Sequence, residues 1–289
     1  MTQQQLLYVL LALFAGPLVG GLLAGIDRKL SARLQGRVGP PILQPIYDLC
    51  KLFQKDALVV NQFQIIYVML HLAFMLATVV LLVLGQDLLL ILFAHAFSTI
   101  SLILGGMSVR SPYSRIGSMR RIMQMAAYEP ILIMAVVGVY LANSAGGHGS
   151  FMASRVIQSG QPLLASLPLI FLTLVAAMAI KFQKSPFDVA TSHHAHQELV
   201  RGITLEYSGP FLGIIELTHF YELFVLFGVL VAFWAPNLVV GLVLASLSFS
   251  SLALLDNICA RLTTMWMVRF MWTVPMLLAL SNIVWLYIR

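Results

Sequence analysis

Charged side chains are scarce in this sequence: they make up 10% of its 289 residues, while 60% of the residues are hydrophobic. One soluble core could not enclose that much apolar surface, so a soluble globular fold is excluded. The net charge of +6 does not indicate nucleic-acid binding either, because the basic residues stand in short connections between apolar runs. The composition therefore predicts an integral membrane protein.

Cysteine is also nearly absent, since Cys50 and Cys259 are the only two. This excludes a CxxC pair, the thiolate set of an iron–sulfur cluster and a cysteine zinc site in this chain. If the protein takes part in electron transfer, the redox centres must belong to a partner. We expect this chain to hold no metal and no cofactor. The first five residues are uncharged and the first apolar run can span a bilayer, so we expect no cleavable signal peptide.

Long apolar runs are abundant, and eight of them approach or exceed the roughly 20 residues that cross about 30 Å of hydrocarbon. They lie near 6–26, 65–85, 88–109, 122–142, 163–182, 210–235, 238–257 and 268–288. Fifteen of the seventeen Lys and Arg residues fall in the odd-numbered connections, which the positive-inside rule assigns to the cytoplasm. The prediction is an all-α integral membrane protein with eight transmembrane helices, both termini outside, and one domain over 1–289.

Two features modify this plan. The first span contains Gly16, Pro17, Gly20 and Gly21, small or kinking residues that indicate a closely packed, buried helix. The first cytoplasmic connection follows a GPP turn with an amphipathic pattern that predicts a helix, either at the membrane surface or against a partner. Its apolar positions are Ile46, Leu49, Leu52 and Phe53, and opposite them stand Asp48, Lys51 and Lys55.

The polar stretch 184–210, KSPFDVATSHHAHQELVRGITLEYSGP, separates two long apolar runs. It contains the carboxylates Asp188, Glu198 and Glu206 and the histidines His193, His194 and His196. Such clustering in one connection indicates a functional site, although a solvated loop is the alternative. The HxxH spacing is a weak metal signal without a nearby cysteine, so the histidines are better explained as partner contacts, as proton-loading groups or as solvated side chains.

Three further carboxylates, Glu129, Glu216 and Glu222, lie inside or at the edge of apolar spans, where an ionised, unpaired acid costs about 2.5 to 3.5 kcal/mol. With Asp188, Glu198 and Glu206 they predict a hydrated chain of acids from the cytoplasmic surface to mid-membrane. His219 is three residues from both Glu216 and Glu222, within reach of either. Pairing of Glu216 or Glu222 with Lys181 or an arginine near the interface is the alternative. Pro130 predicts an opening for water beside Glu129, and His71 and His95 are interpreted as hydrogen-bonded packing residues.

Several blocks of the sequence resemble a known family. RVGPP with LQPIYDLCKL, then RSPYSRIGSMRRIMQMAAYEP, then KSPFD followed by ELVRG and EYSG, are similar to the signature blocks of the complex I subunit 1 family, in the family's order. The resemblance implies an eight-helix membrane subunit to which a peripheral redox arm docks, with an acidic path toward ion-translocating subunits. It assigns Arg37, Asp48, Lys51 and Lys55 to the docking surface and cavity, to which we add His193, His194, His196 and Arg201.

The spacer ATSHHAHQ between PFD and ELV departs from the short acidic stretch usual in quinone-reducing complexes. It is similar to that of energy-converting nickel–iron hydrogenases of the Ech type, including those linked to carbon monoxide oxidation. The resemblance then implies a ferredoxin-dependent, hydrogen-evolving complex in the cytoplasmic (inner) membrane that moves H⁺ or Na⁺. The implied partners are hydrogenase large and small subunits, a ferredoxin-like cluster subunit and an antiporter-like membrane subunit, which hold the nickel–iron centre and the 4Fe-4S clusters. A quinone-site subunit, a passive anchor and a free-standing transporter remain alternatives, although no repeated halves are visible.

Overall fold

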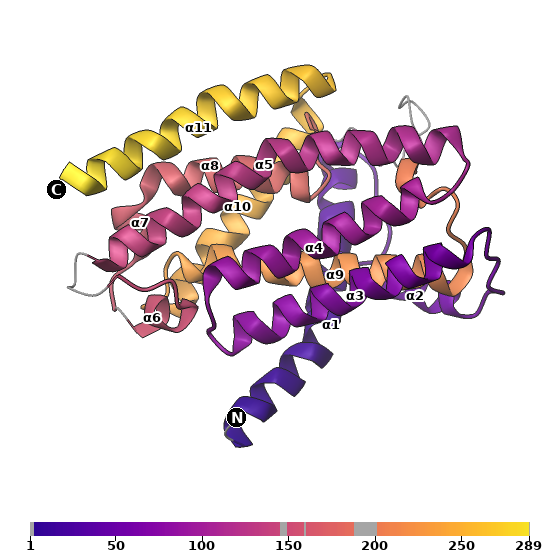
Figure 1. Cartoon of the computed structure of the whole chain (residues 1–289), viewed down its shortest axis with the longest axis horizontal. Coiled ribbons are helices and arrows are strands. Elements are labelled where there is room, and N and C mark those ends of the chain that lie inside the picture. Colours follow the sequence, from indigo (N-terminus) through magenta and orange to yellow (C-terminus); the bar gives the residue numbers. More distant parts are fainter. Residues whose placement is uncertain (1–2, 145–148, 159, 188–200, 289) are drawn as a thin grey trace. The chain divides into compact units, whose positions relative to one another are not determined.

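The computed structural model describes residues 3–144, 149–158, 160–187 and 201–288. This part of the chain consists of helices joined by loops, with one isolated β-bridge between Asp87 and Met152 (Figure 1). The all-α membrane fold expected from the apolar runs is therefore confirmed.

Within the described residues, seven helices are long and apolar enough to cross a membrane. They are α1 (Gln3–Leu34), α3 (Gln62–Val83), α4 (Leu88–Met107), α5 (Pro112–Ser144), α9 (Gly209–Ala232), α10 (Leu238–Ile258) and α11 (Thr264–Ile288). The shorter elements are α2 (Gln44–Phe53), α6 (Ala153–Gln158), α7 (Leu163–Ser166), α8 (Pro168–Lys181) and the 3-10 helix η1 (Gly202–Thr204).

The fifth expected span corresponds to α7 and α8, which are separated at Leu167. A residue that precedes proline is disfavoured in helical conformation, and Leu167 precedes Pro168. The remaining α8 has 14 residues, or about 21 Å of helix, which is less than the hydrocarbon thickness. The count of eight spans and the outside location of both termini stay predictions.

The helix α5 differs from expectation at two prolines. It begins at Pro112, so the basic third connection largely forms its first turns, where a missing N–H has no helical partner to lose. It also continues through Pro130, and the expected break beside Glu129 is not observed. Membrane helices tolerate such prolines because neighbouring groups satisfy the freed carbonyl.

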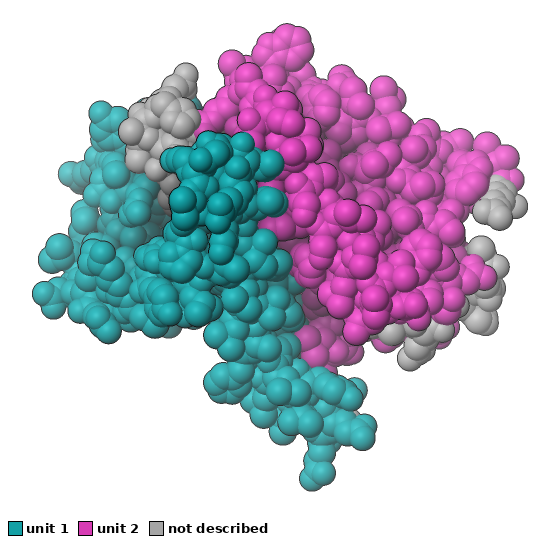
Figure 2. All heavy atoms as spheres, turned by 180° about the vertical axis from the view of Figure 1, so that it is seen from behind, with its two compact units in different colours: residues 1–80, 93–123, 188–225 teal, residues 81–92, 124–187, 226–289 magenta. Residues whose placement is uncertain are grey.

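The chain divides into two compact units, each built from discontinuous segments (Figure 2). Unit 1 comprises Met1–Val80, Phe93–Met123 and Asp188–Val225, and unit 2 comprises Leu81–Leu92, Gln124–Phe187 and Leu226–Arg289. The assignment of 1–289 to one domain stays a prediction.

In unit 1, α1 packs through one glycine-bearing face. A Cβ at Gly20 would overlap the backbone carbonyl of Phe220 in α9, and a Cβ at Gly25 would overlap that of Ile42. These close approaches require glycine. The apolar side chains on the rest of α1, including Leu7 and Phe14, are exposed, so α1 is buried on this face only.

In unit 2, the short helix α8 packs against α11 and α10 and is held at both ends. The side-chain amide oxygen of Asn282 in α11 accepts from the N–H groups of Leu169 and Ile170, both at 3.1 Å. At the other end, Asp256 of α10 accepts from Lys184 Nζ at 3.2 Å and from the Ser185 N–H at 2.8 Å. Because the first N–H groups of a helix have no intrahelical partner, Asn282 supplies bonds that lipid could not.

Candidate functional site

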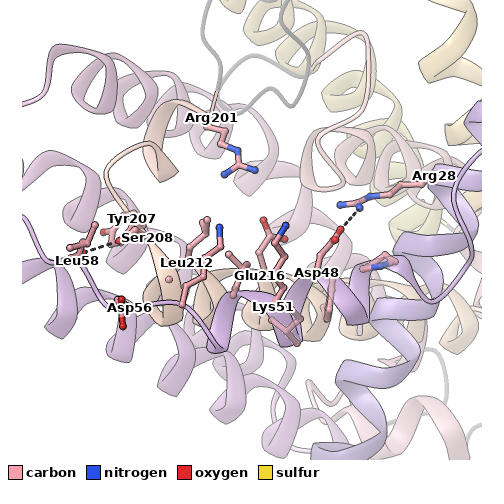
Figure 3. A pocket seen from close by; sticks show the side chains of 16 residues that line it. Arg28, Asp48, Lys51, Asp56, Leu58, Arg201, Tyr207, Ser208, Leu212 and Glu216 are labelled. Atoms are coloured by element: carbon pink, nitrogen blue, oxygen red, sulfur yellow. Dashed lines mark hydrogen bonds and ion pairs between the residues drawn. The ribbon is translucent and has the colours of Figure 1, made fainter.

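A cavity of about 660 Å³ lies in unit 1, where α1, α2 and α9 face the segment 201–209 (Figure 3). Its wall carries seven charged side chains, the basic Arg28, Lys51, Lys55 and Arg201 and the acidic Asp48, Asp56 and Glu216. The remaining lining is Pro45, Leu49, Leu52, Leu58, Tyr207, Ser208, Gly209, Leu212 and Phe220. The walls are therefore far richer in charge than the chain as a whole, of which 10% is charged.

The amphipathic helix α2 forms one wall of this cavity. Its range confirms the predicted helix, and Pro45 occupies a first-turn position that suits proline. Asp48 on α2 accepts from the guanidinium of Arg28 on α1 at 3.1 Å and from the Gln44 side-chain amide at 2.9 Å. Because the Arg28 and Asp48 side chains are each 45% exposed, this pair contributes at most about 1 kcal/mol. Its consequence is to fix the position of two charges at the cavity.

Arg201 enters the cavity from the opposite side (Figure 3). Its backbone is left-handed, with φ of 57°, a conformation that costs a non-glycine residue roughly 1 kcal/mol. Backbone strain of this kind concentrates at ligand and switch sites. η1 follows directly and packs so closely against α5 that a Cβ at Gly117 would lie 2.7 Å from the Ile203 nitrogen. The packing of η1 thus holds the strained residue in place.

Tyr207 closes the cavity beside the start of α9. The residue is 6% exposed and packs with Val68, Leu212 and Ile215 in the core of unit 1. Burial raises the pKa of its hydroxyl above the ordinary value, so the group stays neutral. Glu206, the preceding residue, is half-buried and does not line the cavity.

Beyond the cavity, α9 carries a buried carboxylate between two histidines. Glu222 Oε1 lies 3.5 Å from Nε2 of His95 on α4, and Oε2 lies 3.6 Å from Nδ1 of His219. The neighbour relation expected for His219 and Glu222 is confirmed. His95, expected to be a packing residue bonded to a neighbour, contacts the carboxylate of Glu222. His71 does serve packing, because its Nδ1 donates to the Ser98 carbonyl at 2.8 Å and so joins α3 to α4.

Unit 2 contains a second carboxylate within a membrane helix, the half-buried Glu129, with different neighbours. Lys181 of α8 is 1% exposed, and its Nζ lies 4.3 Å from the centre of the Tyr128 ring. The Lys181 ammonium also attracts the adjacent Glu129 carboxylate electrostatically. Within the described part of the chain, Glu129 Oε2 and the Tyr128 hydroxyl make no hydrogen bond.

The structure brings together Asp48, Lys51, Lys55, Arg201 and Glu216 from the expected set, all around one cavity. Arg37 does not join them: it is exposed, and its guanidinium donates to the Gln35 side chain. Asp188, His193, His194, His196 and Glu198 lie outside the described residues.

Sequence reasoning did not assign Arg28, Asp56 and Tyr207 to the cavity that they line. It named His95 as a packing residue but not its contact with Glu222. Arg28 follows a span and is explained by topology alone, whereas an intramembrane histidine such as His95 is itself a functional signal. In the part of the chain that the structure describes, no three His, Cys, Asp or Glu residues are grouped to hold a metal ion.

Comparison with known proteins gives four likenesses. The model of the NADH dehydrogenase family matches residues 6–287. Formate hydrogenlyase subunit 4 of Escherichia coli is 31% identical over 87% of this chain and 88% of that protein. One NADH-quinone oxidoreductase subunit from Bacillus mycoides is 29% identical over 94% of this chain and 90% of that protein. A chain of the membrane-bound sulfane sulfur reductase, an archaeal respiratory membrane complex, has the same fold, with a TM-score of 0.83, 23% identity and coverage of 98% and 99%.

Proposed function

Because this chain belongs to the NADH dehydrogenase family, of the complex I subunit 1 type, we propose that it is the membrane-anchoring and coupling subunit of an energy-converting hydrogenase. In this role it links ferredoxin-dependent electron transfer in a docked cytoplasmic arm to the translocation of H⁺ or Na⁺. The proposed partners are hydrogenase large and small subunits with the nickel–iron centre and 4Fe-4S clusters, a ferredoxin-like cluster subunit and an antiporter-like membrane subunit.

The observation that carries this proposal is that α9 both lines the charged cavity and bears the buried acid Glu222. Glu216 lies in the cavity wall, and His219 and Glu222 follow on the same helix. A change of charge in a partner at the cavity acts on Glu216 through a medium of lower dielectric than water, where Coulomb interactions are stronger. The proposed ion path comprises Glu129, Glu216, Glu206, Glu198, Asp188, Glu222 and His219.

The choice of a hydrogenase is supported by two observations. The relative from Escherichia coli is a formate hydrogenlyase subunit, and the ATSHHAHQ spacer resembles that of energy-converting hydrogenases. The buried Lys181 and Glu222 and the half-buried Glu129 further favour a coupling role over a passive anchor, since intramembrane ionisable residues are costly without a function.

A quinone site is the second candidate, and the cavity's size favours it. Its volume of about 660 Å³ falls within the range of roughly 300 to 1,000 Å³ that small-molecule sites occupy. The relative from Bacillus mycoides belongs to an NADH-quinone oxidoreductase. Small-molecule pockets are mostly apolar, however, and seven charged side chains line this one.

The test is purification of the native complex through a tag on this chain. We expect a large subunit with paired CxxC motifs to co-purify, and we expect H₂ evolution from reduced ferredoxin. Quinone reduction without a hydrogenase subunit would establish the second candidate, and a chain that runs alone on a native gel would exclude both.

Docking at the cavity has its own matched pair of variants. Lys51→Glu reverses a charge in the cavity wall, whereas Arg155→Glu reverses an exposed charge on α6, outside the cavity. We expect the first variant to lose the soluble subunits during purification and the second to retain them. Equal retention in both variants would place docking away from the cavity.

A further inference from the structure

We infer that His95, Glu222 and His219 form a proton-binding site that accepts H⁺ and rejects Na⁺, and that Glu216 connects it to the charged cavity. The inference rests on the proposed function, which leaves the translocated ion open.

The two histidines approach the carboxylate at different oxygens. His95 Nε2 on α4 faces Oε1 at 3.5 Å, and His219 Nδ1 on α9 faces Oε2 at 3.6 Å. The side chains of His95 and Glu222 are 9% and 10% exposed, whereas that of His219 is 28% exposed. The order of burial therefore runs from His219 inward to Glu222 and His95.

The depth of this cluster follows from the lengths of its two helices. Glu222 stands thirteen residues beyond Gly209, the first residue of α9 and a lining residue of the cavity, so it lies about 20 Å along the helix. His95 stands twelve residues before Met107, the end of α4, or about 18 Å from that end. This end of α4 is near the cavity, because Gly105 packs against the Tyr207 hydroxyl. The cluster thus lies deep within the hydrocarbon thickness.

Glu216, His219 and Glu222 succeed one another at intervals of three residues on α9. Residues at this spacing are neighbours on a helix surface, with Cβ atoms about 5 to 6 Å apart. A proton on Glu216 passes to the neutral His219 ring, then to the Glu222 carboxylate, then to His95. Each transfer moves one proton and no electron, and each donor returns to its deprotonated form. Small rotations of the rings close the distances of 3.5 and 3.6 Å to the hydrogen-bond range.

The chemistry of the cluster selects the ion. A hard cation such as Na⁺ is held by several oxygen ligands, but both oxygens of Glu222 face imidazole nitrogens. When an imidazole is protonated, its positive charge repels Na⁺ and attracts the carboxylate. A ring nitrogen of imidazole can accept a proton and pass it on to a neighbouring acceptor, so the same groups can both bind and release H⁺.

Within the described residues of unit 1, the titratable side chains near the cluster on α3 and α9 bond to backbone carbonyls. His71 on α3 bonds to the Ser98 carbonyl, and the Tyr221 hydroxyl donates to the Leu13 carbonyl of α1 at 2.6 Å. The stretch 10–26 of α1 contains no charged residue. Asp48 and Lys51 of α2 stand in the cavity wall with Glu216, on the entry side of the relay.

The experiment uses the whole purified complex in liposomes, driven by reduced ferredoxin. Proton movement is followed with a pH-sensitive dye and Na⁺ movement with ²²Na⁺, each per H₂ evolved. We expect H⁺ movement to persist in Na⁺-free buffer. His95→Gln and His219→Gln keep a polar side chain but lose the exchangeable proton, so we expect each to lower H⁺ movement per H₂ by about 100-fold.

His71→Gln is the matched control, a buried histidine on α3 that we expect to retain H⁺ movement. Native gels establish that each variant assembles, and the more exposed His219 remains informative if the His95 variant does not fold. Electron-driven ²²Na⁺ uptake, or unchanged H⁺ movement in both variants, would overturn the inference and leave the proposed function intact. Turnover of the wild-type complex without any ion movement would overturn the proposed function and the inference with it.

Discussion

Glu222 in unit 1 and Glu129 in unit 2 both lie within membrane helices, but their neighbours differ in chemistry. Glu222 lies between two imidazoles, at 3.5 and 3.6 Å. Glu129 lies beside an ammonium, that of Lys181, whose Nζ also contacts the Tyr128 ring. A neutral imidazole both donates and accepts a hydrogen bond, whereas an ammonium only donates, so the two carboxylates meet different chemistry.

The role of an acid within a membrane helix therefore depends on the side chains around it. An acid beside imidazoles can change its proton occupancy together with them, whereas an acid beside a lasting cation gains a steady attraction for its ionised form. The sequence alone placed Glu129 and Glu222 in one class, because both are carboxylates in apolar runs.

The largest expected effect comes from neutralising the two acids separately. We expect Glu222→Gln to lower H⁺ movement per H₂ by about 100-fold, because it removes the shared proton acceptor of both histidines. Glu129→Gln should cause a smaller loss, since Glu129 stands outside the cluster of His95, Glu222 and His219. The dye assay in liposomes measures H⁺ movement in both variants. An equal loss in the two would show that Glu222 and Glu129 do not differ in their role.

Replacement of Lys181 tests the surroundings of Glu129 in unit 2. Lys181→Met keeps the length of the side chain and loses the contact with the Tyr128 ring, which contributes about 2 kcal/mol in a desolvated site. We expect a lower thermal stability of the detergent-solubilised complex, with ion movement per H₂ preserved. Adding Glu129→Gln should recover part of the stability, because the carboxylate is then no longer charged. Strictly additive losses would show that Lys181 and Glu129 do not interact.

Glu216 tests whether the cavity feeds only the histidine-flanked acid. We expect Glu216→Gln to lower H⁺ movement by about tenfold, since water in the cavity can replace part of its role. Asp87→Asn, which neutralises a half-buried acid outside the cavity and keeps the oxygen that accepts from the Leu89 N–H, is the matched control and should stay near the wild-type rate. An effect of Glu216→Gln no larger than that of Asp87→Asn would place the entry point elsewhere.

The smallest effect concerns Tyr207 and alkaline pH. Its pKa is raised by burial, so the unfolded chain ionises from about pH 10 while the folded chain stays neutral. The stabilisation is complete below about pH 10 and is lost as the pH rises further, by up to about 1.4 kcal/mol per pH unit. The melting temperature is measured between pH 9 and 11, about one unit on either side of that value. It should fall less steeply with rising pH for Tyr207→Phe than for wild type. Tyr113→Phe, at an exposed position, should follow the wild-type curve.

Much of the fold was predictable, because hydrocarbon imposes simple rules on sequence. The long apolar runs correspond to membrane-length helices, with α7 and α8 in place of the fifth, and the pattern from Ile46 to Phe53 matches α2. Pro130 and Pro112 were less informative, since a membrane helix accommodates a proline that a soluble helix would not.

The candidate site was predictable only as a list of costly residues. Asp48, Lys51 and Arg201 carry charge near the expected cytoplasmic surface, and the structure collects them around one cavity. Arg37 carries the same signal and lies outside it. Charged residues stand out in this sequence because they are few, but the sequence does not tell which of them meet around the cavity. That depends on how α1, α2 and the segment 201–208 pack.

The membrane location of this chain was already evident from the sequence, because 60% apolar residues in long runs have no other stable environment. The sequence also showed which residues are costly in free energy there, since acidic and basic side chains are unfavourable in hydrocarbon. The partners of these residues follow from the fold alone: His95 and Glu222 are 127 positions apart in the chain and meet through a side-chain contact between α4 and α9. Sequence order carries no record of such a contact, and it is the contact that separates a proton-exchanging acid from one held beside a lysine.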